Sequence, residues 1–211
     1  MAAHVDAFVF FDDVHFIKKG FIHRNQILSD GQAKRFTVPV RQVSQNRRIH
    51  EHEYTGEFDS FLALVERCYR RAPHFETVFP MVAEVVAGNE RNVARVNARS
   101  IEMVLAYLGV QQRFSLASVL EIPDDIRGQD RILAVCELLN ATHYINASGG
   151  RALYNKDVFE QRGLQLQFFE PELPKYDQGG GDFVNGLSIL DAMMWCAPEY
   201  LAALVSQGQS V

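Results

Sequence analysis

The sequence has few cysteines, no excess of basic residues and no long hydrophobic run. Its three cysteines, Cys68, Cys136 and Cys196, lie far apart without a CxxC motif, which argues against a disulfide framework or a zinc knuckle. The net charge of −5 disfavours non-specific binding to nucleic acid. No apolar stretch reaches the roughly 18 residues of a membrane span, and the N-terminus lacks a basic signal region. We therefore expect a cytoplasmic protein that binds no nucleic acid and inserts into no membrane.

What is present is the composition of a globular α/β protein. The chain has 211 residues, of which 47% are hydrophobic and 22% charged. The run "DAFVFFDD" (6–13) is typical of a strand buried on both faces of a parallel sheet. The second half alternates helical and strand patterns with glycine turns between them. We predict one domain over residues 1–211, with a mixed or mainly parallel sheet flanked by helices and a helical middle section.

The middle section has clear helix boundaries. A helical period begins at Phe58 and is stopped by Pro73, and the next helix contains Pro80, which is expected to kink it or to lie in its first turn. The following helix is expected to end at Gly109 as a C-terminal cap. Upstream, "SDG" (29–31) predicts a turn before the strand "KRFTVPV" (34–40).

Three titratable residues, Asp12, Asp13 and His15, directly follow the predicted first strand. In open α/β sheets ligands bind beyond the carboxyl ends of strands, so these residues are candidates for a site. Other interpretations stay open: Asp13 as a cap of the next turn, His15 as a hydrogen-bonded surface histidine, or all three as ligands of a divalent metal.

A second strand end carries small residues. Ser148, Gly149 and Gly150 follow "THYINA" (142–147), and their backbone amides would allow close approach of an anion or a carbonyl. The segment "HRNQI" (23–27) places Arg24 and Asn25 in a predicted loop. There Arg24 would suit a phosphate or carboxylate, or the two would form a plain surface pair.

Two further motifs have structural and functional interpretations. Ser188 and Asp191 match a helix capping box, although a capping serine can also face a site. The stretch "HEHEY" (50–54) looks like a metal-binding tract, but it lacks the HExxH spacing, so we predict that it is exposed.

Four segments together resemble the WbqC-like protein family over nearly the whole chain. They are "DAFVFFDDVHFIKKGFIHRNQI", "RFTVPV", "CELLNATHYINASGGRALYNKDVFEQRGLQLQFFEP" and "FVNGLSILDAMM". The resemblance implies a single WbqC-like domain. Members of the family usually open with a further strand and a motif like His-Gln-Pro-x-Tyr-x-Pro-Trp-x-Gly-Tyr. This sequence begins at the later segment, so we expect it to lack that motif and, if the leading histidine is catalytic, part of the site.

The resemblance implies a role in the biosynthesis of O-antigen, other surface polysaccharides or natural products. The implied activity is an acyl- or aminoacyl-transferase that forms an amide on a nucleotide-linked amino sugar or another small amine. The donor would be a thioester on coenzyme A or on an acyl or peptidyl carrier protein, with no bound metal or cofactor. Asp12, Asp13 and His15 are the expected catalytic residues. The expected substrate-binding residues are Arg24, Asn25, Ser148, Gly149, Gly150, Tyr154, Ser188 and Asp191.

Five of the expected residues have an assigned role in this hypothesis. Asp13 or His15 would take a proton from the attacking amine, and the Gly149 and Gly150 amides would stabilise the oxyanion or bind the donor phosphate. Arg24 would bind the diphosphate. Two alternatives remain: an ATP-using ligase or nucleotidyltransferase in which the acids hold magnesium, and a non-catalytic scaffold subunit of a glycan assembly complex.

Overall fold

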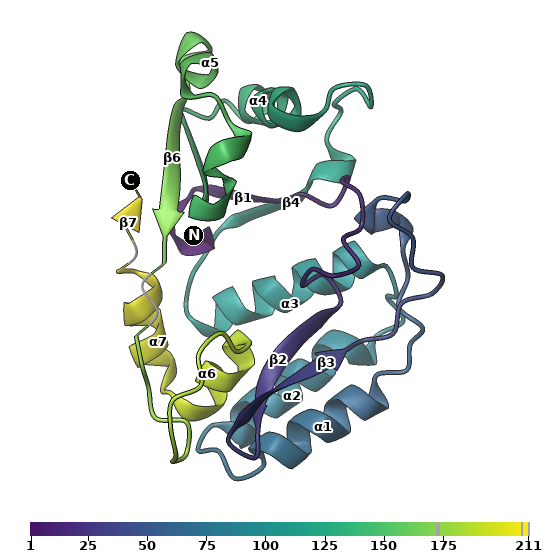
Figure 1. Cartoon of the computed structure of the whole chain (residues 1–211), viewed down its shortest axis with the longest axis vertical. Helices are drawn as coiled ribbons and strands as arrows, with labels where there is room; N and C mark the ends of the chain where they lie inside the picture. Colours follow the sequence, from purple (N-terminus) through teal and green to yellow (C-terminus); the bar gives the residue numbers. More distant parts are fainter. Residues whose placement is uncertain (172–173, 208, 211) are drawn as a thin grey trace. The chain divides into compact units, whose positions relative to one another are not determined.

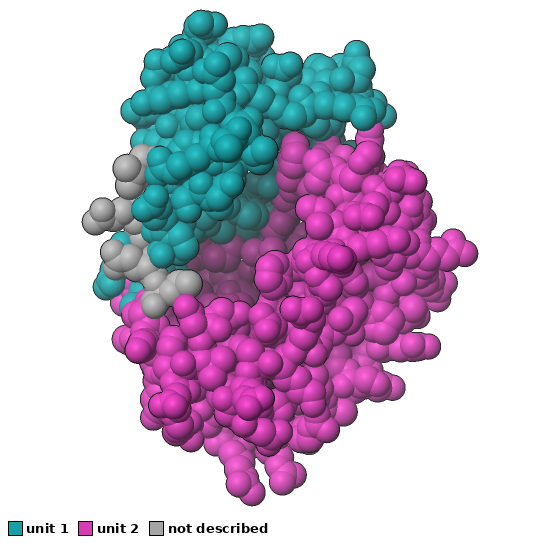
Figure 2. All heavy atoms as spheres, viewed as in Figure 1, with its two compact units in different colours: residues 1–9, 112–173, 204–211 teal, residues 10–111, 174–203 magenta. Residues whose placement is uncertain are grey.

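A computed structural model describes residues 1–171, 174–207 and 209–210 of the chain (Figure 1). The chain forms two compact units, each built from segments that are far apart in the sequence. Unit 1 comprises residues 1–9, 112–173 and 204–211, and unit 2 comprises residues 10–111 and 174–203 (Figure 2). The chain therefore passes between the units four times, so neither unit is one continuous segment.

Unit 2 consists of a β-hairpin and helices (Figure 1). Its elements are β2 (Arg24–Ser29), β3 (Gln32–Thr37), η2 (Ile49–Glu51), α1 (Asp59–Tyr69), α2 (Phe75–Ala87), α3 (Val93–Tyr107) and α6 (Ile189–Trp195). The hairpin is antiparallel, and Asp30 and Gly31 form its two-residue turn with φ of 52° and 73°. Both angles are positive, as the tight hairpin turn requires, which confirms the turn predicted at "SDG".

The helices of unit 2 begin and end close to the predicted positions. α1 ends at Tyr69, before Pro73, and α3 is followed by Gly109 with φ of 70°. Asn92 caps the start of α3, because its side-chain oxygen accepts a hydrogen bond from Arg95 N at 3.2 Å. Pro80 lies inside α2 and not in its first turn.

A hydrophobic core joins distant parts of unit 2. Its buried members are Phe16, Tyr54, Phe58, Val85, Val93 and Val96. They come from the segment after β1, from the segment before α1, and from helices α2 and α3. The core therefore fixes the segments around residues 16 and 54 against α3, which matters for the site below.

Unit 1 contains a small parallel sheet with helices. Its elements are η1 (Ala2–His4), β4 (Arg113–Leu116), η3 (Ala117–Val119), α4 (Gly128–Leu138), β5 (His143–Ala147), η4 (Ser148–Leu153), α5 (Lys156–Gln161), β6 (Gln165–Glu170) and β7 (Gln209–Ser210). Strands β5 and β6 are parallel, with Tyr144 opposite Leu166, and β7 pairs antiparallel with β6. The elements β1 (Ala7–Phe10) and α7 (Pro198–Val205) cross from one unit to the other.

The predicted fold class is confirmed: the chain is a mixed α/β protein with short parallel and antiparallel sheets flanked by helices. The first strand differs from its prediction. β1 has four residues, all half-buried, and it forms a two-stranded sheet with β4. With one neighbour among the described strands, β1 is not a central strand, and its apolar run does not mark burial on both faces.

Candidate functional site

The segment after β1, residues 12–16, runs antiparallel beside residues 47–50. Phe16 N donates to Arg47 O at 3.0 Å, and Ile49 N donates to Val14 O at 2.9 Å. An isolated bridge pairs His15 with Arg48. The predicted catalytic segment is therefore held by backbone hydrogen bonds to a stretch of the chain more than thirty positions later.

The three predicted catalytic residues differ in their surroundings. Asp12 and Asp13 are buried, with exposed fractions of 3% and 6%, whereas His15 is exposed. The backbone carbonyl of Asp12 also accepts a hydrogen bond from the backbone amide of His50 at 3.1 Å. Burial of a carboxylate is costly unless it is compensated, so the burial of both acids is chemically significant. Their catalytic role stays a prediction.

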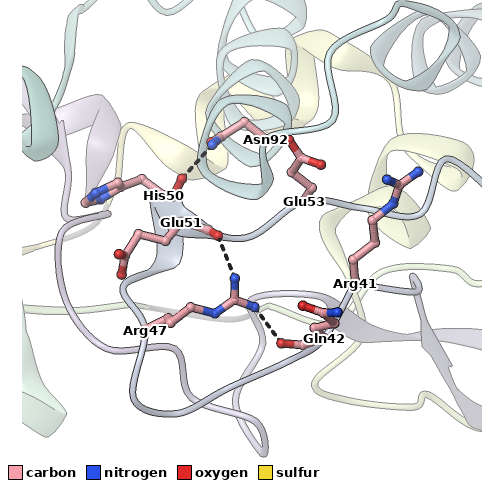
Figure 3. Close-up of a pocket in the computed structure, with 7 residues that line it drawn as sticks. All are labelled: Arg41, Gln42, Arg47, His50, Glu51, Glu53 and Asn92. Carbon is pink, nitrogen blue, oxygen red and sulfur yellow. Dashed lines mark hydrogen bonds between the residues drawn. The ribbon is translucent and has the colours of Figure 1, made fainter.

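An open pocket of about 620 Å³ lies in unit 2 beside this segment (Figure 3). Its lining residues are Arg41, Gln42, Arg47, His50, Glu51, Glu53 and Asn92. All except Asn92 come from the irregular stretch between β3 and α1. The pocket therefore brings two arginines, two glutamates and a histidine around one cavity.

Hydrogen bonds inside the pocket wall fix its shape (Figure 3). Arg47 donates to the carbonyls of Gln42 and Glu51 at 2.5 Å and 3.3 Å. Asn92 Nδ2 donates to His50 O at 2.6 Å. Asn92 N in turn donates to the Glu90 carboxylate, and this bond is the main reason that the pKa of Glu90 is lowered. The start of α3 is thus tied to the pocket.

The pocket carries charge of both signs. Carbonyl groups do not neutralise a guanidinium, and in the described part of the chain neither Arg41 nor Arg47 forms an ion pair with a carboxylate. Glu51 and Glu53 are exposed. The pocket therefore suits a ligand that has an anionic group and a cationic group.

The protonated nitrogen of His50 follows from its hydrogen bond. His50 Nδ1 lies 3.1 Å from the carbonyl oxygen of Asp12. Because a carbonyl only accepts, this nitrogen carries the proton, and Nε2 of the neutral ring keeps its lone pair. A histidine oriented in this way is able to accept a proton at Nε2.

His52 holds the pocket loop together, and the predicted exposure of "HEHEY" is wrong at this position. His52 is fully buried, at 0% exposure. Its Nδ1 donates to Arg48 O at 2.8 Å, and its Nε2 accepts from Ser44 N at 3.1 Å. His52 packs against the core residue Phe16. The burial of His52 cannot be predicted from a strand-like alternation, because residues 50–54 do not form a strand.

Arg24 and Asn25 lie on strand β2 and not in the loop that the sequence predicts. Their pairing partners on β3 are Thr37 and Phe36. Arg24 Nε donates to Gly20 O at 2.8 Å, so the arginine holds the preceding turn. The pattern missed the strand because "HRNQILS" mixes polar and apolar residues without regular alternation.

Asp191 is the centre of a buried polar network in unit 2. Its carboxylate accepts hydrogen bonds from Tyr69 Oη at 2.8 Å, from Tyr176 Oη at 2.7 Å and from Gln178 Nε2 at 2.9 Å. Burial and the nearby carboxylate raise the pKa of both tyrosines, so both remain donors. Ser188 is the N-cap of α6, as predicted, with Oγ accepting from Leu190 N.

The remaining predicted residues belong to unit 1. Ser148, Gly149 and Gly150 begin the short helix η4, directly after β5. A Cβ atom on Gly150 would lie 2.7 Å from Asn146 Nδ2, whereas one on Gly149 would meet nothing within 4 Å. Tyr154 packs edge-on against Phe159, in the aromatic cluster of unit 1. The substrate-binding role of these residues stays a prediction.

The sequence did not single out most of the pocket. Arg41, Gln42 and Arg47 belong to no spaced motif, and their one common signal is the high density of charged residues between positions 41 and 53. Asn92 carries no such signal, whereas His50, Glu51 and Glu53 lie in the "HEHEY" stretch. Among the described residues, no three histidine, cysteine or acidic side chains are arranged to hold a metal ion. Within the same residues, no helix has the length and hydrophobicity of a membrane span.

The fold and the pocket define an α/β protein with a pocket lined by charges of both signs. The WbqC-like protein family matches residues 1–203, and the chain belongs to this family. The chain is also similar to the uncharacterized protein Rv1507c of Mycobacterium tuberculosis (strain ATCC 25618 / H37Rv). The two are 25% identical over 209 residues, which cover 95% of this chain and 90% of that protein. No solved structure matches the chain significantly.

Proposed function

We propose that the protein is an acyl- or aminoacyl-transferase that forms an amide on a nucleotide-linked amino sugar, with a thioester as the donor. The observation that carries the proposal is the mixed charge of the unit 2 pocket. Arg41 and Arg47 offer guanidinium groups to a diphosphate, and Glu51 and Glu53 offer carboxylates to a sugar ammonium. An amino-sugar nucleotide has both charges in one molecule.

The proposed reaction requires a base that takes a proton from the amine. The amine attacks the thioester carbonyl only after it has lost a proton. A C–N bond then forms, the C–S bond breaks, and the thiolate leaves and takes up a proton. His50 is suited to the first step, because the Asp12 carbonyl holds its Nδ1 proton and leaves Nε2 as acceptor. Asp13 and His15 remain the alternative bases.

A direct assay tests the proposal. The chain is incubated with UDP-glucosamine and acetyl-coenzyme A, free thiol is measured with a chromogenic reagent, and the amide is identified by mass spectrometry. We expect thiol release that depends on the amino sugar. The Arg41→Met variant should raise KM for the sugar nucleotide about tenfold, equivalent to about 1.4 kcal/mol of lost binding.

Arg41 is a useful position because its side-chain hydrogen bond to Thr55 O, at 3.5 Å, is too long to hold the fold. Arg35→Met is the matched control, since Arg35 is exposed on β3 of the same unit. Equal KM values for the two variants would contradict the assignment of the pocket. Consumption of ATP with release of AMP or diphosphate, and no thioester cleavage, would favour the ATP-using alternative.

A further inference from the structure

A short loop of unit 2 presents apolar and basic side chains to solvent. Ile17 is 58% exposed and Phe21 is 73% exposed, and Lys18 and Lys19 between them are exposed as well. We call residues 17–21 the Ile17–Phe21 loop. Among the large hydrophobic residues that the structure describes, Phe21 has the highest exposed fraction. Exposed apolar and aromatic side chains that lie together are characteristic of binding surfaces.

The exposure of this loop is not the fraying of a loose segment. Gly20 N donates to Ile17 O at 3.1 Å, which closes a turn, and Arg24 Nε donates to Gly20 O at 2.8 Å. The flanking residues are fixed: Phe16 is in the core of unit 2, and Ile22 packs against that core. The loop is therefore preorganised, which lowers the entropic cost of binding.

The turn also depends on a glycine for close approach. A Cβ atom on Gly20 would lie 3.2 Å from Cγ2 of Ile17. A side chain at position 20 would therefore crowd the exposed Ile17. Arg24, which the sequence suggested for phosphate binding, instead holds this loop in its conformation.

The charge of the loop indicates the charge of its partner. The chain carries a net charge of −5, yet Lys18 and Lys19 have no carboxylate partner among the described residues. Two adjacent unpaired ammonium groups attract a surface rich in carboxylates. A partner that covers the loop would therefore combine acidic side chains with an apolar contact for Phe21 and Ile17.

A membrane fits these features less well than a protein. Recognition of anionic lipid by charge takes clusters of about four to eight basic residues, and a small apolar insertion alone gives only marginal binding. The loop supplies two lysines and two large apolar side chains. Two lysines and two apolar side chains are enough to match an acidic protein surface that has an apolar contact.

We infer that the Ile17–Phe21 loop is the docking site for an acidic partner protein. Resting on the proposed function, the partner of this chemistry is the carrier protein that holds the acyl thioester. The position of the loop supports this assignment. Phe16 N, directly before the loop, donates to the backbone carbonyl of Arg47, a residue that lines the pocket, at 3.0 Å. The loop therefore begins next to the pocket wall, where a bound carrier would hold its thioester near the pocket.

Binding of an acyl carrier protein loaded with an acetyl group tests the inference. Calorimetry at low salt would compare the wild-type chain with the double variant Lys18→Glu, Lys19→Glu and with Phe21→Ser. We expect affinity to fall at least about tenfold in both variants, and wild-type binding to weaken with added salt. The control Lys34→Glu, Arg35→Glu makes the same change of charge on exposed β3 residues and should bind like the wild type.

Two outcomes would overturn the inference: no binding of the carrier to the wild-type chain, or equal losses in the loop variants and the control. Binding of the loop to vesicles of anionic lipid, without binding to the carrier, would replace the acidic protein by a membrane surface. Turnover with acetyl-coenzyme A separates this inference from the proposed function. If the loop variants keep that turnover and lose only carrier binding, both stand. If no variant and no wild-type chain turns over any thioester while the carrier still binds, only the proposed function fails.

Discussion

At the scale of single residues, the most constrained group is the Asp191 carboxylate. It is fully buried, and both of its oxygens accept hydrogen bonds. Sequence similarity to a capping box explains why Ser188 begins α6, but it does not explain Asp191, which turns inward to Tyr69 and Tyr176. A structural role and a substrate-binding role of Asp191 can be told apart, because the first predicts a loss of stability on replacement and the second a loss of activity.

Replacing Asp191 by asparagine should destabilise the protein by about 1–3 kcal/mol, because the new amide group faces donors and not acceptors. Urea unfolding of Asp191→Asn measures this change. The control is Asp182→Asn at an exposed position, which should alter stability by less than about 0.5 kcal/mol. Unchanged stability with lost activity would contradict the structural role and favour substrate binding by Asp191.

A second residue, His23, links stability to pH. Burial is the main cause that lowers its pKa, and the charge of Arg24 lowers it further. The folded protein therefore binds fewer protons at His23 than the unfolded chain does, so its contribution to stability is complete above the usual pKa of about 6.5. It is lost as the pH falls below that value toward the lowered pKa.

We therefore expect the urea midpoint to fall between pH 7 and pH 5, and part of this fall to disappear in His23→Phe. Phenylalanine keeps the ring contact with Phe16, whose centroid lies 5.1 Å from that of His23. It also removes the buried Nδ1 atom, which has no hydrogen-bond partner among the described residues. The exposed His15 provides the control variant, His15→Phe. An identical pH dependence in wild type and His23→Phe would refute the linkage.

At the scale of elements, the β2–β3 hairpin shows the clearest agreement between sequence and structure. Its turn depends on two consecutive residues with positive φ, Asp30 and Gly31. Asparagine and aspartate tolerate this conformation, glycine adopts it freely, and alanine does so only with strain. The local sequence therefore selects the turn, and the turn sets the pairing register of the two strands.

Gly31→Ala should cost about 1–2 kcal/mol, since a Cβ atom at position 31 meets nothing within 4 Å and only the backbone conformation is strained. Gly31→Asn, which tolerates positive φ, should cost much less. Thermal unfolding of both variants makes the comparison. If the alanine variant were as stable as the asparagine variant, backbone strain would not govern this turn.

The irregular elements are less evident from the sequence. The stretch between β3 and α1 contains the short helix η2 and most of the pocket. It has neither helical nor strand periodicity, so its conformation depends on hydrogen bonds to residues 12–16 and on the buried His52. Sequence patterns identify regular elements because their periodicity is local, and this stretch has none.

At the scale of the whole molecule, the chain order does not match the division into units. Unit 2 uses residues 174–203 together with residues 10–111. The C-terminal segment completes unit 2 through long-range contacts: Tyr69 bonds to Asp191, 122 positions away, and Ser188 N donates to Gln26 O at 2.7 Å. The prediction of a single domain over residues 1–211 stays a prediction.

Long-range folding also explains which parts of the candidate site could be predicted from the sequence. The segment "DDVHF" (12–16) was predicted to contribute to a site because three titratable residues follow an apolar run. It lies beside the pocket, since His50 Nδ1 donates to the Asp12 carbonyl. Arg41, Gln42 and Asn92 had no comparable signal, because their proximity arises from folding and not from spacing. Gly149 belongs to unit 1 and does not line the pocket of unit 2.

The sequence by itself determined the helices, the hairpin turn and the resemblance to the WbqC-like family, because periodicity, capping residues and turn residues act over a few positions. Only the tertiary structure decided which charges surround the pocket, that His52 is buried and that Asp191 meets two tyrosines. These features depend on pairings between residues far apart in the chain. The free energy of such pairings comes from burial and hydrogen bonds that exist only after the core has formed.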